Sequence, residues 1–326
     1  MTDRLAPLRR NRFIVLGRAG MDLYADPPGT RIETAPRFTA ALGGSSANIA
    51  VALARQGAAA ALVTCVSDDA VGRFCRSELT RYGVDTRYLR DVGGEARNSL
   101  AVVETRAPIC QSVIYRNNAA DFQMDPADIE AIDFSGIGGL IATGTLLASE
   151  PSRTATLRGF ARARAAAVPV IFDIDHRPYS WASAALASEI CAQAAALSDI
   201  VIGNDDEFAL LAGSHEAGPE AARSLARSTA AFTVYKRGAL GAVTCVGDTE
   251  THTGIYAVTA LKPTGAGDGF MGGLIAGLAA GHSLPDAVAR GAATAAIVVT
   301  HVGCAPAMPD TATLDAFIAR HGPPGR

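Results

Sequence analysis

Short apolar runs alternate with helical patterns along most of the chain. The runs have the length and β-branched content of buried strands, and the segments between them repeat apolar residues at helical spacing. Strands are expected at residues 13–17, 60–66, 138–143, 169–173, 200–203, 232–236 and 242–246. Helices are expected at residues 45–56, 71–82, 152–166, 182–196, 205–212, 266–280, 284–300 and 311–320. This alternation predicts an α/β fold with a doubly wound, mainly parallel sheet and helices on both faces.

Two segments, residues 31–41 and 98–116, interrupt the alternation. The second predicts a hairpin of residues 100–104 and 109–116 that turns at Arg106-Ala107-Pro108. Together the two segments predict a small β-sheet lid, with lid segments at about 22–41 and 96–118. No repeat or long linker divides the chain, so we expect a single domain over residues 1–326.

Charge and apolar run lengths exclude several classes of protein. The 326 residues include 29 basic and 32 acidic side chains, and the basic ones are dispersed, so no nucleic-acid partner is expected. The longest apolar stretch, residues 270–281, is shorter than the roughly 20 residues of a membrane span. Near the N-terminus, Arg18 interrupts an apolar run too short for a signal peptide. We therefore expect a cytoplasmic protein without a membrane partner, and the six scattered cysteines indicate neither zinc nor a disulfide framework.

Lysine is nearly absent from the chain. Of the 29 basic residues only Lys236 and Lys262 are lysines. A compact ammonium differs from a planar guanidinium in size and geometry, so these two positions are candidates for a specific role. The alternative is that both lysines persisted by chance.

The segment Thr264-Gly265-Ala266-Gly267-Asp268-Gly269-Phe270 leads directly into a helix of small residues. Glycines at a helix start let backbone N–H groups converge on an anion, and the helix dipole adds to the attraction. The segment therefore predicts a phosphate or oxyanion site, with a Gly-rich turn capped by Asp268 as the alternative. Neither a P-loop motif nor an intact Gly-x-Gly-x-x-Gly after a strand is present, which argues against an ordinary P-loop and a dinucleotide dehydrogenase.

A second glycine segment, Gly43-Gly44-Ser45-Ser46-Ala47-Asn48, opens an earlier helix. The Asn48 amide can both donate and accept, and Asp22, shortly after the first strand, can accept two hydroxyl protons. These partners suit a polyol. Ser45 as an ordinary N-cap and Asp22 as a turn residue are the alternatives.

The order of these segments resembles the ribokinase family of carbohydrate kinases over residues 12–320. The resemblance implies that Asp268 is the catalytic base and that the N–H groups of Gly265, Ala266 and Gly267 form the anion hole. It further implies that Asp22, Gly44 and Asn48 hold sugar hydroxyls, that ATP and Mg²⁺ take part, and that the lid can join two copies in a homodimer. A carboxylate at a helix N-terminus has its charged form stabilised, so we expect Asp268 to be a weak base that acts mainly by position.

Three further segments resemble the nucleotide side of that family. Asn204-Asp205-Asp206-Glu207 resembles an Asn-x-x-Glu motif in which Glu207 acts on magnesium through water, although a capping box is an equally good interpretation. Residues 234–241 resemble the strand and glycine turn along the nucleotide, which implies contacts at Lys236, Gly238 and Gly241. Lys236 either contacts a phosphate or is only the last residue of a strand. Residues 292–303 correspond to the stretch that forms the adenine slot in that family.

The segment 172–181 bears on the substrate, because Arg177 follows a predicted strand where open α/β sheets bind ligands. A guanidinium there can hold a carboxylate, whereas the alternative is an ion pair with Asp173 or Asp175. The segment resembles that of keto-deoxy sugar-acid kinases within the family, which makes Arg116 a second cation. The resemblance implies phosphorylation of the 6-hydroxyl of a sugar acid, with 5-dehydro-2-deoxy-D-gluconate of inositol catabolism as the expected substrate. The alternatives are 2-dehydro-3-deoxygluconate, fructose, or a non-catalytic sugar-acid-binding protein.

The chain departs from the family at one position. Many members have Asp-Thr-Thr before the Gly-Ala-Gly-Asp segment, and the acid helps to bind an activating potassium ion, whereas this chain has Lys262-Pro263-Thr264. An ammonium there can supply the ion's positive charge and repel the ion itself. We therefore expect Lys262 to substitute for a monovalent cation, with a surface lysine as the alternative.

Overall fold

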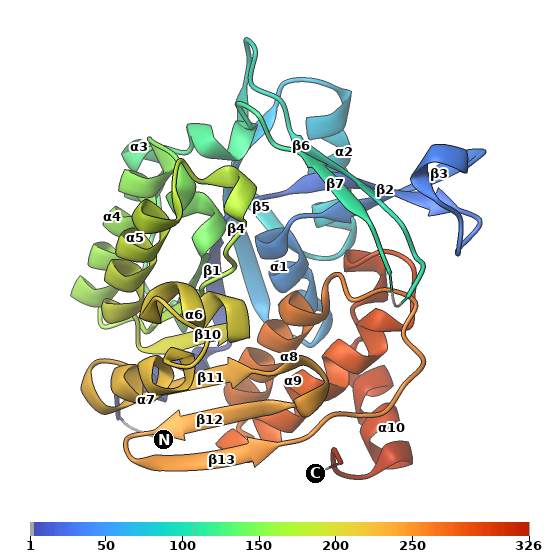
Figure 1. Cartoon of the computed structure of the whole chain (residues 1–326). Coiled ribbons are helices and arrows are strands. Elements are labelled where there is room, and N and C mark those ends of the chain that lie inside the picture. The colour runs from blue at the N-terminus through green and yellow to red at the C-terminus, as the bar shows by residue number, and fades with distance from the viewer. Residues whose placement is uncertain (1–2, 108, 326) are drawn as a thin grey trace.

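The computed structural model describes residues 3–107 and 109–325, and its main sheet has nine strands in the order β13-β12-β11-β10-β9-β8-β1-β4-β5 (Figure 1). The strands from β11 to β5 are parallel, and β12 and β13 continue the sheet antiparallel at one end. Their bounds are β1 Arg12–Leu16, β4 Ala59–Ser67, β5 Asp85–Val92, β8 Gly139–Thr143, β9 Val170–Asp173, β10 Ile200–Asn204, β11 Phe232–Lys236, β12 Ala242–Val246 and β13 Thr249–Thr253. The predicted doubly wound, mainly parallel sheet is confirmed.

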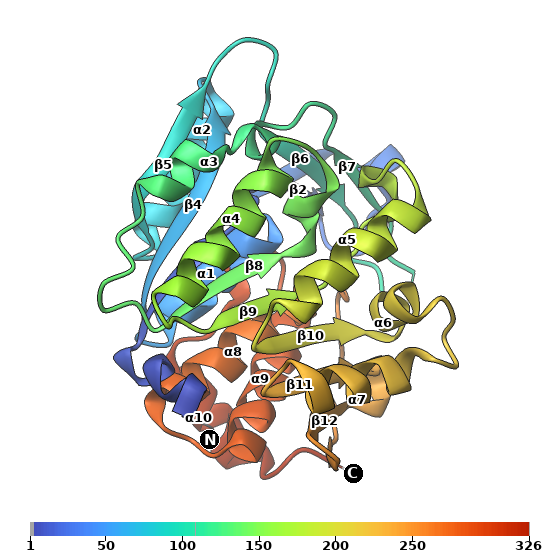
Figure 2. The same ribbon diagram turned by 90° about the vertical axis from the view of Figure 1, so that its left-hand side faces the viewer.

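Helices cover both faces of this sheet because successive strand residues point to opposite sides. In β1, Phe13 and Val15 join one apolar core, while Ile14 and Leu16 join the other. The first core is covered by α1 Ser45–Arg55, α2 Ala70–Arg81, α8 Ala266–Ala280 and α9 Leu284–Val299, with α10 Thr311–His321 packed on α9. The second is covered by α3 Pro126–Glu130, α4 Ser152–Ala165, α5 Ala184–Ala196, α6 Asp205–Ala212 and α7 Gly218–Ser228. Figure 2 shows α4 and α5 lying across this second face.

A separate sheet of four strands has the order β3-β2-β6-β7. Its strands are β2 Gly20–Asp26, β3 Arg37–Gly43, β6 Ser99–Val103 and β7 Ser112–Tyr115. The antiparallel β6–β7 hairpin confirms the expected pairing, although Pro108 of the expected turn lies outside the described residues. The sequence pattern did not predict β2, which lies between β3 and β6 and pairs with both. We call these four strands the lid sheet.

The elements that the pattern missed have polar or small-residue faces. The edge strands β5 and β13 are polar, and every residue of β13 is at least partly exposed. Helix α7 places only Gly218, Ala222 and Ala226 in the interior, so it lacks the large apolar stripe that predicts a helix. Helix α3 has only five residues. The apolar pattern therefore gives no strong signal for these elements.

Short 3-10 segments complete the chain. They are Asp3–Arg10, Ile32–Thr34, Ala120–Gln123, Gly144–Ala148, Pro178–Ser180, Gly238–Leu240 and Ala305–Ala307. Within the described ranges, no helix combines the length and apolar character that crossing a membrane requires. Polar residues end several central strands: Asp173 ends β9, Asn204 ends β10 and Lys236 ends β11. The carboxyl ends of parallel strands meet at one edge of the sheet, where the site is found.

Candidate active site

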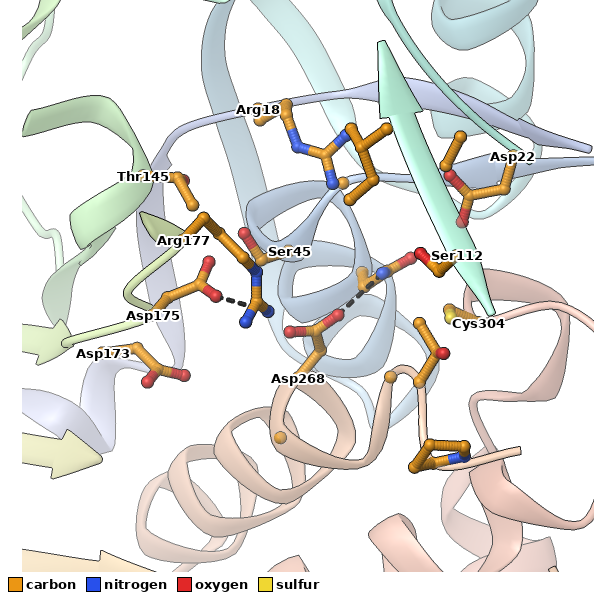
Figure 3. A pocket seen from close by; sticks show the side chains of 18 of the residues that line it. Arg18, Asp22, Ser45, Ser112, Thr145, Asp173, Asp175, Arg177, Asp268 and Cys304 are labelled. Carbon is orange, nitrogen blue, oxygen red and sulfur yellow. Dashed lines mark hydrogen bonds and ion pairs between the residues drawn. The ribbon is translucent and has the colours of Figure 1, made fainter. Parts of the chain in front are cut away.

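A cavity of about 400 Å³ lies between the strand ends, the lid sheet and the first turns of α1 and α8 (Figure 3). Lid strands β6 and β7 supply Ala101, Val103, Ser112 and Ile114 to its wall. The cavity brings together most of the residues expected from the sequence: Asp22, Gly44, Asn48, Arg116, Arg177, Asn204, Glu207, Lys236, Gly265, Gly267 and Asp268. Segments separated by more than two hundred residues in sequence thus form one polar site.

The glycine segment at 264–270 forms the start of α8, as expected. Gly265 is the N-cap with a φ of 86°, and a Cβ there would lie 2.7 Å from Cys304 Sγ, so only glycine fits. The first N–H groups of a helix have no acceptor within the helix, and here those of Ala266 and Gly267 lie at the start of a 15-residue helix. This turn has the geometry and the dipole to bind an anion.

Asp268 lies in the first turn of α8 and faces the cavity. Asn48 Nδ2 on α1 donates a hydrogen bond of 2.7 Å to Asp268 Oδ2, so this amide orients the carboxylate. Burial, with a contribution from the nearby Asp175 carboxylate, raises the pKa of Asp268 to about 7. The expectation of a weak base was therefore wrong, because loss of water around the carboxylate outweighs the stabilising effect of the helix start.

Asp22 and Gly44 form the cavity wall near the lid sheet. Gly44 has a φ of 99°, and a Cβ there would lie 2.4 Å from the carbonyl oxygen of Arg18, so glycine is required for α1 to start beside the β1–β2 connection. The Tyr24 hydroxyl donates to Asp22 Oδ2 at 3.1 Å. Asp22 Oδ1 is buried without a hydrogen-bond partner within the described part of the chain. That oxygen is available to a hydroxyl donor in the cavity.

Arg177 pairs with Asp175, as the structural alternative predicted. Arg177 Nη2 lies 2.7 Å from Asp175 Oδ1, yet 44% of the arginine side chain stays exposed, and the residue lines the cavity. Figure 3 shows its guanidinium between the carboxylates of Asp175 and Asp268. The pair fixes the cation at the centre of the site and leaves it able to meet a further anion.

Arg116 is held more firmly than Arg177. It follows β7, and its guanidinium pairs with Asp121, donates to the carbonyl oxygen of Thr145 at 3.1 Å and lies 4.1 Å from the centre of the Phe122 ring. Only 4% of its side chain is exposed. Arg116 therefore reaches the cavity wall with Nη1 and Nη2 already engaged, while its buried Nε has no hydrogen-bond partner within the described residues.

Lys236 lies at the meeting point of the anion-binding turn and a group of buried carboxylates. Its Nζ is 3.6 Å from Asp173 Oδ1, and a Cβ at Gly267 would lie 3.3 Å from that nitrogen. Burial lowers the pKa of Lys236, but the carboxylates of Asp173 and Glu207 outweigh it and raise the pKa overall. Burial has the reverse effect on the neighbouring acid and raises the pKa of Asp173 to about 7. The ammonium therefore stays charged beside the turn.

Asn204 and Glu207 form the capping box that the sequence allowed. Asn204 Oδ1 accepts from the Glu207 N–H at 2.9 Å, and Glu207 Oε2 accepts from the Asn204 N–H at 2.7 Å. Burial raises the pKa of Glu207. Over residues 3–107 and 109–325, no three His, Cys, Asp or Glu side chains are grouped to hold a metal ion. A Mg²⁺ ion here would depend on phosphate oxygens and water, its usual ligands beside nucleotides.

A second cavity of about 840 Å³ adjoins the first and is largely apolar. The two share Asn204, Lys236, Pro263 and Gly267. Its wall includes Gly238, Gly241 and Ala266, together with Ala292, Ala295, Ala296 and Val299 from the expected adenine-slot stretch. The sequence analysis missed a further part of the wall, which contains Ile255, Tyr256 and Val258. A flat apolar group with phosphates fits this pair of cavities, with the phosphates at Lys236 and Gly267.

Lys262 is fully buried beneath the anion-binding turn, so the surface-lysine alternative is wrong. Its Nζ donates to the carbonyl oxygens of Thr264 at 2.6 Å and Val298 at 3.3 Å, and it lies 3.9 Å from Cys304 Sγ. An ammonium thus joins the turn before α8 to the end of α9.

Sequence reasoning missed three residues of the site: Arg18, Tyr24 and Cys304. Arg18 and Cys304 line the first cavity, and the Tyr24 hydroxyl lies 3.2 Å from Cys304 Sγ. Arg18 could have been found, because it follows the first strand at the binding edge of the sheet. Tyr24 and Cys304 carry no local signal, since they meet from positions 280 residues apart.

Comparison with known proteins agrees with this geometry. The chain is 39% identical over 310 residues to 5-dehydro-2-deoxygluconokinase of Photobacterium profundum, covering 94% of each chain. It is 34% identical over 314 residues to 5-dehydro-2-deoxygluconokinase of Geobacillus kaustophilus, covering 95% of this chain and 94% of the other.

Among solved structures, a double mutant of fructokinase from Vibrio cholerae O395, bound to fructose, ADP and a potassium ion, is similar with a TM-score of 0.83. The two chains are 27% identical, and the match covers 94% of this chain and 98% of the other. Residues 10–311 match the pfkB family carbohydrate kinase description. With its glycine turn at the start of α8, the carboxylate of Asp268 beside that turn and two adjoining cavities, the chain belongs to the pfkB family of carbohydrate kinases.

Proposed function

We propose that this kinase transfers the γ-phosphoryl group of ATP to the 6-hydroxyl of a sugar acid, 5-dehydro-2-deoxy-D-gluconate. The observation that carries the proposal is the position of Arg177, a cavity-facing cation beside the Asp268 carboxylate. A neutral sugar does not require a guanidinium at this point, whereas a carboxylate gains charge-assisted hydrogen bonds from it. The names of the two relatives support the same substrate.

Asp268 acts as the general base in this proposal. As the substrate oxygen bonds to phosphorus and the bond to the ADP oxygen breaks, Asp268 accepts the hydroxyl proton. Asn48 orients the carboxylate, since its amide donates to Oδ2. In this proposal the N–H groups of Gly265, Ala266 and Gly267, at the helix start, stabilise the charge of the transferred group.

The apolar cavity receives the adenine ring, with Gly238 and Gly241 along the nucleotide and Lys236 at its phosphates. Mg²⁺ supplies charge neutralisation of the phosphates when bound. Glu207 would hold the ion through water, because one of its carboxylate oxygens already accepts from the Asn204 N–H in the capping box. At the sugar end, Asp22 and Gly44 meet hydroxyl groups, and Arg116 adds positive charge at the wall.

The test is ADP release from ATP with a panel of acceptors, measured in a coupled assay. The panel contains 5-dehydro-2-deoxy-D-gluconate, 2-dehydro-3-deoxygluconate, fructose and ribose at equal concentrations. The first compound is expected to give the highest kcat/KM. A higher kcat/KM with fructose or ribose contradicts the sugar-acid proposal. If no acceptor in the panel gives ADP release, the proposed kinase activity is wrong.

The Arg177 assignment gives a second expected result. Arg177→Met should weaken sugar-acid binding by about 1.5 to 3 kcal/mol, the scale of a charge-assisted hydrogen bond, and leave the KM for ATP nearly unchanged. KM values for both substrates measure this directly. Equal increases in KM for the sugar acid and for ATP would show that the Arg177–Asp175 pair serves only the structure of the loop after β9.

A further inference from the structure

Arg18 is a cation of the active-site cavity without an acidic partner. It lies between β1 and β2, and its half-buried side chain lines the 400 Å³ cavity. Its Nη1 donates to the Ser99 hydroxyl on lid strand β6 at 2.8 Å. Across the described ranges 3–107 and 109–325, no ion pair joins Arg18 to a carboxylate, although its charge acts on both Asp22 and Asp175.

The other three cations that line this cavity each have an acid beside them. Arg116 pairs with Asp121, Arg177 pairs with Asp175 at 2.7 Å, and Lys236 lies 3.6 Å from Asp173. A cation with a carboxylate partner has part of its attraction for a second anion already satisfied. Arg18 has no such direct pair within the described ranges, and its remaining N–H donors can meet a ligand.

The position of Arg18 suits one end of an extended substrate. Figure 3 shows Arg18 on the opposite side of the cavity from Asp268. In a six-carbon sugar acid, the 6-hydroxyl and the carboxylate are at opposite ends of the carbon chain. A hydroxyl placed at Asp268 therefore directs the carboxylate toward the Arg18 side, past the Arg177 guanidinium.

From these observations we infer that Arg18 binds the substrate carboxylate together with Arg177, and that it strengthens the preference for an acid over a neutral sugar. The inference rests on the proposed sugar-acid kinase function and assigns the far end of its substrate. Ser99 orients the guanidinium from the lid sheet, so binding of the carboxylate also links the substrate to the lid. A planar guanidinium can hold both carboxylate oxygens, which an ammonium cannot do with the same geometry.

The experiment compares kcat/KM for 5-dehydro-2-deoxy-D-gluconate with kcat/KM for a neutral analogue that has a hydroxymethyl group in place of the carboxylate. Arg18→Met should lower the value for the acid about 10- to 100-fold, mainly through KM, and leave the value for the neutral analogue within about twofold. Arg18→Lys should recover part of the loss. The matched control is Arg87→Met, an exposed arginine on β5 outside the cavity, which should leave both values unchanged.

The outcomes separate this inference from the proposed function. If the unaltered enzyme prefers the neutral analogue, the sugar-acid function is wrong. If it prefers the acid and Arg18→Met keeps that preference at full size, only the role of Arg18 is wrong. Equal losses for both acceptors, in a variant with an unchanged melting temperature, would assign Arg18 to lid geometry and overturn the inference.

If Arg18→Met fails to fold, Ser99→Ala provides the second measurement. It is expected to give a smaller loss of kcat/KM that is selective for the acid. An equal loss for both acceptors would contradict the inference.

Discussion

Asp268→Asn is expected to lower kcat by about 10² to 10⁴, the range for a positioned acid-base group, with little change in the KM for ATP. The substitution keeps the shape of the side chain and the start of α8, so the loss reports the proton acceptor. Steady-state kinetics with the sugar acid measure it. The matched control is Asp286→Asn, at the first turn of the neighbouring helix α9 and outside the cavity, which should keep normal turnover. Near-normal turnover of Asp268→Asn would remove this residue from the base role.

The pH dependence provides an independent readout of the same group. Because burial raises the pKa of Asp268 to about 7, the carboxylate loses its ability to accept a proton as the pH falls from 8 to 6. We expect kcat/KM to decrease over that interval in the unaltered enzyme and the residual activity of Asp268→Asn to lack this decrease.

The contribution of Asp268 to the stability of the folded protein should increase as the pH falls, whereas activity decreases. The folded-state pKa lies above the unfolded value, so ionised Asp268 destabilises the folded protein above pH 7, and this penalty disappears as the pH falls toward about 4. Asp268→Asn should therefore melt at a higher temperature than the unaltered protein at pH 8.

The second large effect is expected at Lys262, the buried ammonium beneath the anion-binding turn. Lys262→Ala removes the donor to the carbonyl oxygens of Thr264 and Val298 and leaves both without it in the interior. Leaving a buried polar group unsatisfied costs about 1 to 3 kcal/mol. We expect lower stability and a strong loss of activity, because the turn before α8 loses the charge that holds its shape. Lys262→Met keeps most of the side-chain volume and separates lost charge from lost packing.

The effect of potassium on activity tests whether the Lys262 ammonium takes the place of an activating monovalent cation. An ammonium and a monovalent cation at adjacent sites repel each other by several kcal/mol at an effective dielectric constant of about 20, so only one should be present. The unaltered enzyme should therefore show no potassium dependence at constant ionic strength. Lys262→Asp should lose activity in sodium or choline buffer and gain a response to added potassium. Strong potassium stimulation of the unaltered enzyme would show that this interpretation of Lys262 is wrong.

Much of the fold could be predicted because its central strands are buried on both faces. Such strands consist of near-continuous apolar runs, and β1, β8 and β9 matched their predicted positions within one residue. Strand β2 was missed for a different reason. It carries Asp22 and Tyr24 in a sheet that folds over the site, and its alternation of buried and half-buried positions is too weak to predict a strand by itself.

The sequence by itself determined the doubly wound fold, the two helix starts and most of the residues that meet at them. These properties are local, since glycines at 44 and 265 adopt backbone angles that other residues avoid, and the apolar period specifies the central strands and the long helices. Only the tertiary structure decided how those groups behave. The pKa of Asp268 depends on the water that neighbouring elements exclude. Lys262 donates to the carbonyl oxygen of Val298, which is 36 residues further along the chain. Desolvation and long-range contacts depend on what packs around a group, and the residues beside it in sequence do not specify that packing.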